Sequence, residues 1–194
     1  MTSELSEEQL RALLATARAA SASAKLANIV GRRIADVLKA PSSSQSMIAA
    51  AEWLVSPAWC LALLGGVGNG KSVAAGWLAR AELERGGSVC WIRATEASTA
   101  SLYGPEAAER SKRARTSDLL VVDDLGAELA SAPWASWLSD VLDARYANLD
   151  RAVLTSNLDA AAFKERVGPR LADRIREGKV VGTSSVSMRQ RGGN

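Results

Sequence analysis

The chain has 194 residues, of which 47% are hydrophobic, and its formal net charge is +3. This length and composition predict a globular protein with one main domain and a sizeable buried core. Histidine is absent and only two cysteines occur, which excludes zinc sites and histidine-based catalysis. A net charge of +3 is compatible with nucleic-acid contact but is too small to establish it.

The sequence contains no signal for a membrane or for export. No apolar run approaches the ~20 residues that a helix needs to span a bilayer. The N-terminus carries Glu4, Glu7 and Glu8 and lacks the basic and apolar regions of a signal peptide. We therefore expect a cytoplasmic protein that does not contact membranes.

The first part of the chain is expected to be helical. Over residues 4–39, leucine, isoleucine and valine recur at helical spacing, and Ser21 and Ser23 are candidates for a break. Pro41, three serines and Gln45 then end this segment, as expected of a flexible joint. The predicted units are a helical arm at 1–40, a Ser-rich linker at 41–46 and a core at 47–194.

Helix and strand signals alternate through the core. Continuous apolar runs predict strands at 60–64, 88–92, 119–122, 152–155 and, more weakly, 179–183. Helices are expected at 47–55, 71–85, 96–114, 134–147 and 159–176. Because strands buried on both faces read as continuous apolar runs, this pattern predicts an α/β fold with a parallel β-sheet flanked by helices.

A glycine-rich loop follows the first predicted strand and precedes a helix. The glycines let successive backbone N–H groups point inward and bind an anion at the helix N-terminus. Lys71 is expected to reach the β- and γ-phosphates of a nucleoside triphosphate, and Ser72 to bind Mg²⁺. The residues of this phosphate-binding loop are Gly65, Gly66, Val67, Gly68, Asn69, Gly70, Lys71 and Ser72.

Two acidic residues end the apolar strand at 119–122. Beside a phosphate loop, Asp123 is suited to hold Mg²⁺, usually through water, and Asp124 to orient or deprotonate the attacking water. Paired acids after a strand also occur as helix caps or solvated turns. Together with the phosphate loop, the pair indicates hydrolysis in addition to binding.

The strand at 152–155 also ends in small polar residues. In a parallel sheet the ligand lies at the carboxyl ends of the strands, so Asn157 is placed to bond the γ-phosphate or the water that attacks it. The alternative is that Asn157 caps the helix that begins near Asp159. The two roles are compatible.

An arginine-rich stretch follows at 166–176. Arg170 and Arg174 are four residues apart and therefore share one helical face. One of them is a candidate arginine finger, which donates charge to the γ-phosphate bound by an adjacent subunit. The alternative is a solvated helix in which Asp173 and Glu177 are local partners.

The order of these motifs resembles the DnaC/IstB family of AAA+ ATPases, and the resemblance runs from about residue 57 to the C-terminus. The motifs are the phosphate loop, Leu-Leu-Val-Val-Asp-Asp-Leu-Gly at 119–126, Leu-Thr-Ser-Asn-Leu at 154–158 and Arg-Leu-Ala-Asp-Arg-Ile-Arg-Glu-Gly at 170–178. The last of these is the most distinctive, since the phosphate loop and the paired acids occur in many ATPases.

The resemblance implies a role for each motif. The loop with Lys71 and Ser72 is similar to Walker A, and Asp123 with Asp124 to Walker B. Asn157 corresponds to sensor 1. Arg174 is the first choice for the arginine finger and Arg170 the second. Arg189 falls near the usual Ser-Tyr-Arg-like end of the family and is a further candidate to face the nucleotide or an interface.

The resemblance also implies an architecture and partners. Such proteins have a P-loop NTPase core of the ASCE type without a C-terminal helical lid, and too few residues follow the last motif to form one. They bind ATP and Mg²⁺ and assemble as homo-oligomers on DNA. In the helicase loaders of this family the N-terminal part grips a replicative DNA helicase, which makes residues 1–40 the candidate partner-binding arm.

Three functions remain open. The first is a DnaC-like helicase loader that acts in DNA replication and favours single-stranded DNA. The second is an IstB-like transposition helper that acts on double-stranded DNA with a transposase. The third is a nucleotide-binding adaptor without hydrolysis, because Asp124 stands where glutamate is common in AAA+ proteins. A GTPase is disfavoured because no Asn-Lys-x-Asp motif occurs.

A basic cluster precedes the strand that ends in the paired acids. Its position makes it the best candidate for contacts with the phosphate backbone of DNA. A solvated helix face explains it nearly as well. The cluster consists of Arg110, Lys112, Arg113 and Arg115.

Overall fold

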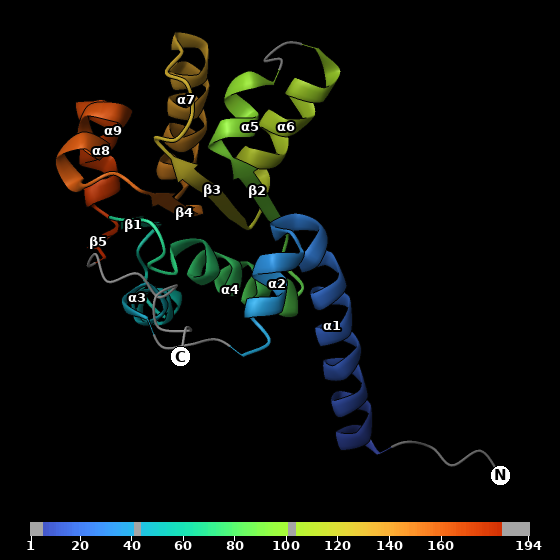
Figure 1. Cartoon of the computed structure of the whole chain (residues 1–194). Coiled ribbons are helices and arrows are strands. Elements are labelled where there is room, and N and C mark those ends of the chain that lie inside the picture. Colours follow the sequence, from blue (N-terminus) through green and yellow to red (C-terminus); the bar gives the residue numbers. More distant parts are fainter. Residues whose placement is uncertain (1–5, 41–43, 101–103, 184–194) are drawn as a thin grey trace.

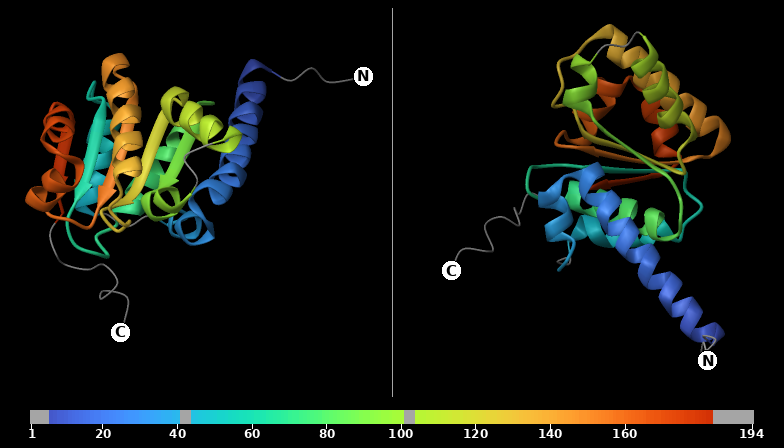
Figure 2. Two further views of the ribbon diagram at one scale, coloured as in Figure 1. Left: turned by 90° about the horizontal axis from the view of Figure 1, so that it is seen from above. Right: turned by 90° about the vertical axis from the view of Figure 1, so that its right-hand side faces the viewer.

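The computed structural model describes residues 6–40, 44–100 and 104–183. Over these residues the chain forms an α/β fold, in which one β-sheet lies between two layers of helices (Figure 1). Seen along the sheet, the two layers stand on opposite sides of it (Figure 2). The expected fold class is therefore confirmed.

All neighbouring strands of the sheet are parallel, and their order is β2-β3-β4-β1-β5. Strand β1, which lies between β4 and β5, is buried along its whole length, as its apolar sequence predicts. The predicted strand ends hold to within one residue, except that β3 runs three residues further, through both acids to Leu125. The bounds are β1 (Cys60–Leu64), β2 (Val89–Arg93), β3 (Leu119–Leu125), β4 (Arg151–Ser156) and β5 (Lys179–Gly182).

The helices divide between the two faces of the sheet. Each face has its own apolar cluster, and each cluster joins strand residues to the helices that cover them. One face carries α1 (Glu7–Val30), α2 (Arg32–Val37), α3 (Gln45–Leu54) and α4 (Lys71–Glu84). The other carries α5 (Ala94–Thr99), α6 (Pro105–Thr116), α7 (Ala132–Asn148), α8 (Ala160–Val167) and α9 (Pro169–Arg176).

Two segments that were expected to be single helices are pairs of helices. Gly104 and Pro105 start α6 separately from α5, and Gly168 and Pro169 separate α8 from α9. Gly168 has φ +83°, which interrupts a helix, and a proline at the first helical position starts the next one. The expectation of unbroken helices at 96–114 and 159–176 was therefore wrong.

The N-terminal helices also break at a different place from the one expected. Ser21 and Ser23 lie inside α1, and the break falls at Gly31, which has φ +82°. The start of α1 is exposed and extends away from the sheet (Figure 1), whereas Ala22, Leu26 and Val30 are buried on one face of the helix.

The second half of the predicted arm shares a hydrophobic core with β1 and α4. The approach of α2 to α4 is close: a Cβ at Gly76 would lie 2.7 Å from Ile34 Cγ2, so glycine is required inside α4. After the arm, Ser44 caps α3 by accepting a hydrogen bond from the Met47 amide, so residues 45 and 46 of the predicted linker are helical. Among the described residues, no helix has the length and apolar character that a membrane span requires.

Candidate active site

The phosphate-binding loop lies between β1 and α4, as predicted. Gly70 has φ +76° and caps α4, whose first residue is Lys71. Gly65 has φ +115°, and a Cβ there would lie 2.5 Å from the Thr183 carbonyl oxygen, so only glycine fits. Lys71 Nζ donates hydrogen bonds to the carbonyl oxygens of Gly65 and Gly66, both at 2.7 Å. These bonds hold the ammonium over the loop.

Two distant elements anchor this loop. Ser46 Oγ, at the start of α3, donates a hydrogen bond of 2.9 Å to the Asn69 carbonyl oxygen. Asn69 Nδ2 donates to Thr183 Oγ1 at 3.2 Å, just beyond β5. One segment that precedes the loop in the chain and one that follows it therefore hold it in place.

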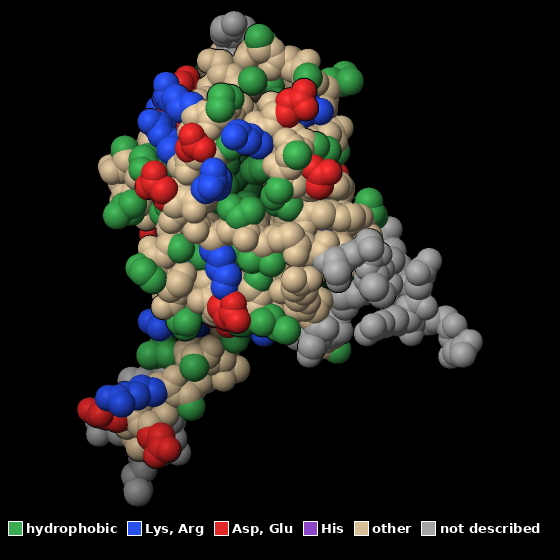
Figure 3. Space-filling model, turned by 90° about the vertical axis from the view of Figure 1, so that its left-hand side faces the viewer, with side chains coloured by type: hydrophobic (Ala, Val, Ile, Leu, Met, Phe, Trp, Pro, Cys, Tyr) green, Lys and Arg blue, Asp and Glu red, His purple; other side chains and the backbone are tan. Residues whose placement is uncertain are grey.

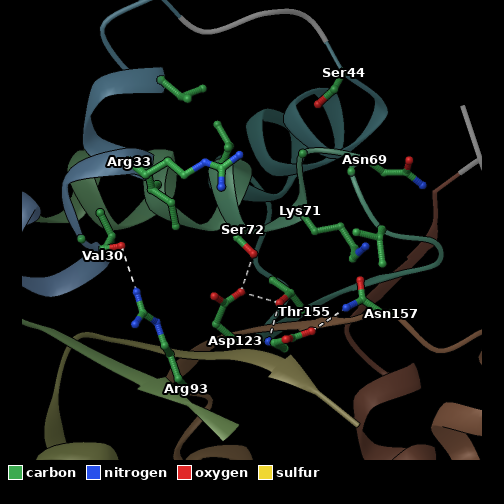
Figure 4. Close-up of a pocket in the computed structure, with 18 of the residues that line it drawn as sticks. Val30, Arg33, Ser44, Asn69, Lys71, Ser72, Arg93, Asp123, Thr155 and Asn157 are labelled. Atoms are coloured by element: carbon green, nitrogen blue, oxygen red, sulfur yellow. Dashed lines mark hydrogen bonds between the residues drawn. The ribbon is translucent and has the colours of Figure 1, made fainter. Parts of the chain in front are cut away.

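Asp123 joins the loop to the sheet. Its Oδ1 accepts hydrogen bonds from Ser72 Oγ at 2.7 Å and from Thr155 Oγ1 at 2.6 Å (Figure 4). Thr155 Oγ1 also accepts a hydrogen bond of 2.9 Å from the Asp124 amide. A hydroxyl and a carboxylate at this separation match the oxygen ligands that Mg²⁺ prefers, so Ser72 and Asp123 fit the ion that the sequence predicts.

Asp124 is aimed by an irregularity in β3. The β3–β4 register shifts between Val122 and Leu125, and Asp124 has φ +62°. Bulges of this kind redirect side chains beside active sites. The Asp124 carboxylate thereby receives a hydrogen bond of 2.6 Å from Asn157 Nδ2.

Charge and burial alter the pKa values of two groups in the site. Partial burial, followed by the charge of Asp123, raises the pKa of Asp124 above its usual range, although Lys71 opposes the shift. Burial likewise lowers the pKa of the Lys71 ammonium, against the opposing effect of Asp124 and Asp123. A raised carboxyl pKa makes Asp124 a better proton acceptor.

These residues line one pocket of about 670 Å³. Its floor consists of the phosphate loop and the strand ends with Asp123, Asp124, Thr155 and Asn157. The opposite wall was not expected: it is the corner between α1 and α2, at residues 30–34 and 37. Figure 4 shows Arg33 reaching from α2 toward the start of α4.

Arg93 is a pocket residue that the sequence reasoning missed. It lies at the carboxyl end of β2, opposite Asp123 in register, and its Nη2 donates a hydrogen bond of 3.4 Å to the Val30 carbonyl oxygen. The rule that led to Asp123, a polar residue at the end of a buried strand, also points to Arg93. Thr155 satisfies the same rule.

The other predicted residues fall in different places. Asp159, which accepts a hydrogen bond from the Ala162 amide, caps α8, so Asn157 does not have the capping role. Arg170 and Arg174 do not line the pocket; both form ion pairs with Asp143 of α7. The expected local partners of these arginines, Asp173 and Glu177, contact Arg176 and Tyr146 instead. Arg189 lies outside the described residues.

The surface around these arginines is mixed in charge. Arg174 is partly buried, with its guanidinium carbon 5.1 Å from the centre of the Tyr146 ring, whereas the Arg170 side chain is 72% exposed. In Figure 3, basic and acidic side chains alternate over the region where α8 and α9 lie. Both arginines therefore lie on this mixed surface, outside the pocket.

A phosphate loop between β1 and α4, with acids at the end of the parallel strand β3, which β4 separates from β1, defines a P-loop nucleotide-binding protein. The family model described as "IstB-like ATP binding protein" matches residues 8–192. The chain therefore belongs to the family of IstB-like ATP-binding proteins, within the DnaC/IstB group of AAA+ ATPases. No curated protein matches it significantly.

Solved structures share the fold at low sequence identity. DnaI is 19% identical with a TM-score of 0.63, over 76% of this chain and 90% of DnaI. The DnaC helicase loader is 21% identical with a TM-score of 0.58, over 72% of this chain and 86% of that one. AMPPCP-bound DnaA from Aquifex aeolicus is 18% identical with a TM-score of 0.60, over 72% of this chain. The match spans only 44% of that DnaA chain, and also 44% of a DNA replication initiation factor.

Proposed function

We propose that this protein is an ATPase of DNA replication that loads a replicative helicase, binding ATP with Mg²⁺ and single-stranded DNA. The observation that carries the hydrolytic part is the joined set of Ser72, Asp123 and Thr155 beside the Asp124–Asn157 pair. Binding alone requires the loop, whereas an oriented acid pair at its edge serves the reaction of water with the γ-phosphate.

Each residue then has a defined task. Lys71 and the amides of the loop bind the phosphates, and Ser72 and Asp123 hold Mg²⁺. When bound, the ion neutralises charge that develops on the phosphate oxygens. Asn157 fixes Asp124, which takes the proton of the water that attacks phosphorus as the bond to ADP breaks. A second subunit supplies Arg174, or Arg170, to the γ-phosphate.

The partner contacts rest on two surfaces. In the first half of α1 the side chains whose burial is described are exposed, and this surface suits the grip on a helicase. Lys112, Arg113 and Arg115 of α6 are exposed and suit contact with the DNA backbone. The similarity in fold to DnaI and to the DnaC helicase loader supports the choice of loader.

A second function is favoured by the family itself. Because the matching family model is the IstB-like one, a transposition helper that acts on duplex DNA with a transposase is the alternative. The same pocket and the same assembly would serve it. The two functions differ in the form of DNA that stimulates hydrolysis.

ATP hydrolysis by the purified protein tests these proposals. The rate is measured alone, with single-stranded DNA and with duplex DNA, over a range of protein concentrations, with Lys71→Ala as the control. Stimulation by single strands, with a rate per subunit that rises with concentration, supports the loader. Preference for duplex favours the transposition helper. Tight ATP binding without hydrolysis under any of these conditions refutes the ATPase and leaves a nucleotide-binding adaptor.

A further inference from the structure

The turn that follows Asp124 is held by two residues to which the hydrolytic site gives no role, Glu128 and Arg166. Glu128 follows β3, and its side chain is only 1% exposed. Arg166 belongs to α8, which follows β4. Both lie outside the pocket, so neither is placed to touch a nucleotide.

Arg166 spans the turn with its two terminal nitrogens. Nη1 donates to the Glu128 carbonyl oxygen and Nη2 to the Gly126 carbonyl oxygen, both at 3.4 Å. Nη1 also lies 3.6 Å from Glu128 Oε1. A planar guanidinium can reach two carbonyl groups and a carboxylate at once, which an ammonium group cannot do with the same geometry.

Glu128 closes the turn from inside. Its Oε2 accepts a hydrogen bond of 2.6 Å from the Gly126 amide. Its Oε1 makes no hydrogen bond within the described residues, so the positive charge of Arg166 is its compensation. A buried carboxylate is costly unless it is hydrogen-bonded and paired, and here the Gly126 amide and Arg166 supply both partners.

The turn needs such support because its backbone is strained. Asp124, with φ +62°, adopts a left-handed conformation that is unfavourable for a residue other than glycine. Gly126 has φ +96°, and a Cβ there would lie 2.5 Å from Leu158 Cδ1. Thr155 holds the Asp124 amide from the side of β4, and Ser156 Oγ donates to the Leu125 carbonyl oxygen. The remaining side of the turn is held by Arg166 and Glu128.

We propose that Arg166 and Glu128 are positioning residues for hydrolysis, which keep the Asp124 carboxylate aimed at the attacking water by fixing residues 124–128. This inference rests on the proposed ATPase function. It assigns to the arginine-rich stretch a role in its own subunit, distinct from that of Arg170 and Arg174. Arg166 acts through the backbone, so binding of the nucleotide does not depend on it.

The test compares Arg166→Met with Arg166→Lys and Glu128→Gln in the full-length chain. The matched control is Arg176→Met, which removes an exposed arginine that pairs with Asp173 on α9. For Arg166→Met we expect kcat to fall about 10–100-fold, the cost of a misplacement on the order of 1 Å, with the KM for ATP and the Kd for a non-hydrolysable analogue unchanged. Arg166→Lys should recover part of kcat, since it keeps the charge.

A purely structural role predicts a different result. Loss of nucleotide affinity in proportion to kcat, or a kcat equal to that of Arg176→Met, would overturn the inference. Thermal unfolding of each variant identifies a failure to fold. If Arg166→Met fails to fold, Glu128→Gln provides the same test, because glutamine keeps an acceptor for the Gly126 amide and removes only the charge that pairs with Arg166. If the unmodified protein binds ATP and hydrolyses none, the proposed function itself fails, which is distinct from hydrolysis that these substitutions leave unchanged.

Discussion

Replacing Thr155 by valine would remove one hydroxyl that links the two acids of the site. Thr155 is 1% exposed, and its Oγ1 donates to Asp123 Oδ1 and accepts from the Asp124 amide. Valine has nearly the same shape, so the substitution leaves packing almost intact. It isolates the contribution of these two hydrogen bonds.

The expected loss of stability follows from these two bonds. A hydrogen bond to a charged group contributes about 1.5–3 kcal/mol, and an unpaired buried amide costs about 1–3 kcal/mol. Because Ser72 continues to satisfy Asp123 Oδ1, we expect the lower part of the sum, about 2.5–4 kcal/mol of the free energy of unfolding. For a chain of this size that corresponds to a Tm lowered by about 5–15 °C. Hydrolysis should fall as well, because both acids lose a fixed position.

The assay is urea unfolding followed by the fluorescence of the six tryptophans, together with ATP turnover. Thr155→Ser is the matched control, since it keeps the hydroxyl and loses a methyl group worth about 1 kcal/mol. Thr155→Val should be less stable than Thr155→Ser and slower in turnover. Equal stability and equal turnover of the two variants would refute the bridging role.

Three further predictions concern the loop and the arginines. Lys71→Ala should weaken ATP binding about 10–100-fold by titration calorimetry, since charge-assisted bonds to phosphate are lost, and unchanged affinity would contradict the loop assignment. Arg174→Ala should keep ATP affinity but lower hydrolysis in the assembled state. Mixing this variant with Asp124→Asn should restore part of the rate. If the mixture restores none, the arginine does not act across subunits. Asp143→Ala leaves Arg170 and Arg174 without their partner and should lower the free energy of unfolding by about 1–2 kcal/mol, with a smaller loss at high salt. Thermal unfolding at two salt concentrations measures this loss. An effect independent of salt would argue against an ionic origin.

The parts of the fold that were predicted correctly depend on local patterns. Apolar runs placed β1 and its neighbours, because strands buried on both faces leave an unbroken hydrophobic signature. The phosphate loop was predicted because strand, glycines, Lys71 and helix are consecutive in the chain. The Gly-Pro pairs at 104–105 and 168–169 were visible signals for new helices, and periodicity alone was the wrong guide there.

The missed features depend on contacts between distant residues. The β3–β4 register brings Thr155 to Asp123, and no local pattern encodes that register. The shift in the β3–β4 register near Asp124 likewise depends on pairing with a distant strand. Because pairing resumes at Leu125, β3 extends beyond its apolar run. Arg170 and Arg174 pair with Asp143, 27 and 31 residues away in the chain, whereas the sequence suggested neighbours in the same helix.

The corner between α1 and α2 contacts both the hydrophobic core and the pocket. Val30 packs in the core beside α4, and its carbonyl oxygen accepts the hydrogen bond from Arg93 at the pocket. Thermodynamic linkage makes such a connection reciprocal. If docking of this corner strengthens ATP binding by some factor, ATP strengthens docking by the same factor. Pulling this corner away from the core would then weaken ATP binding, and loss of ATP would weaken the docking of the corner by the same factor.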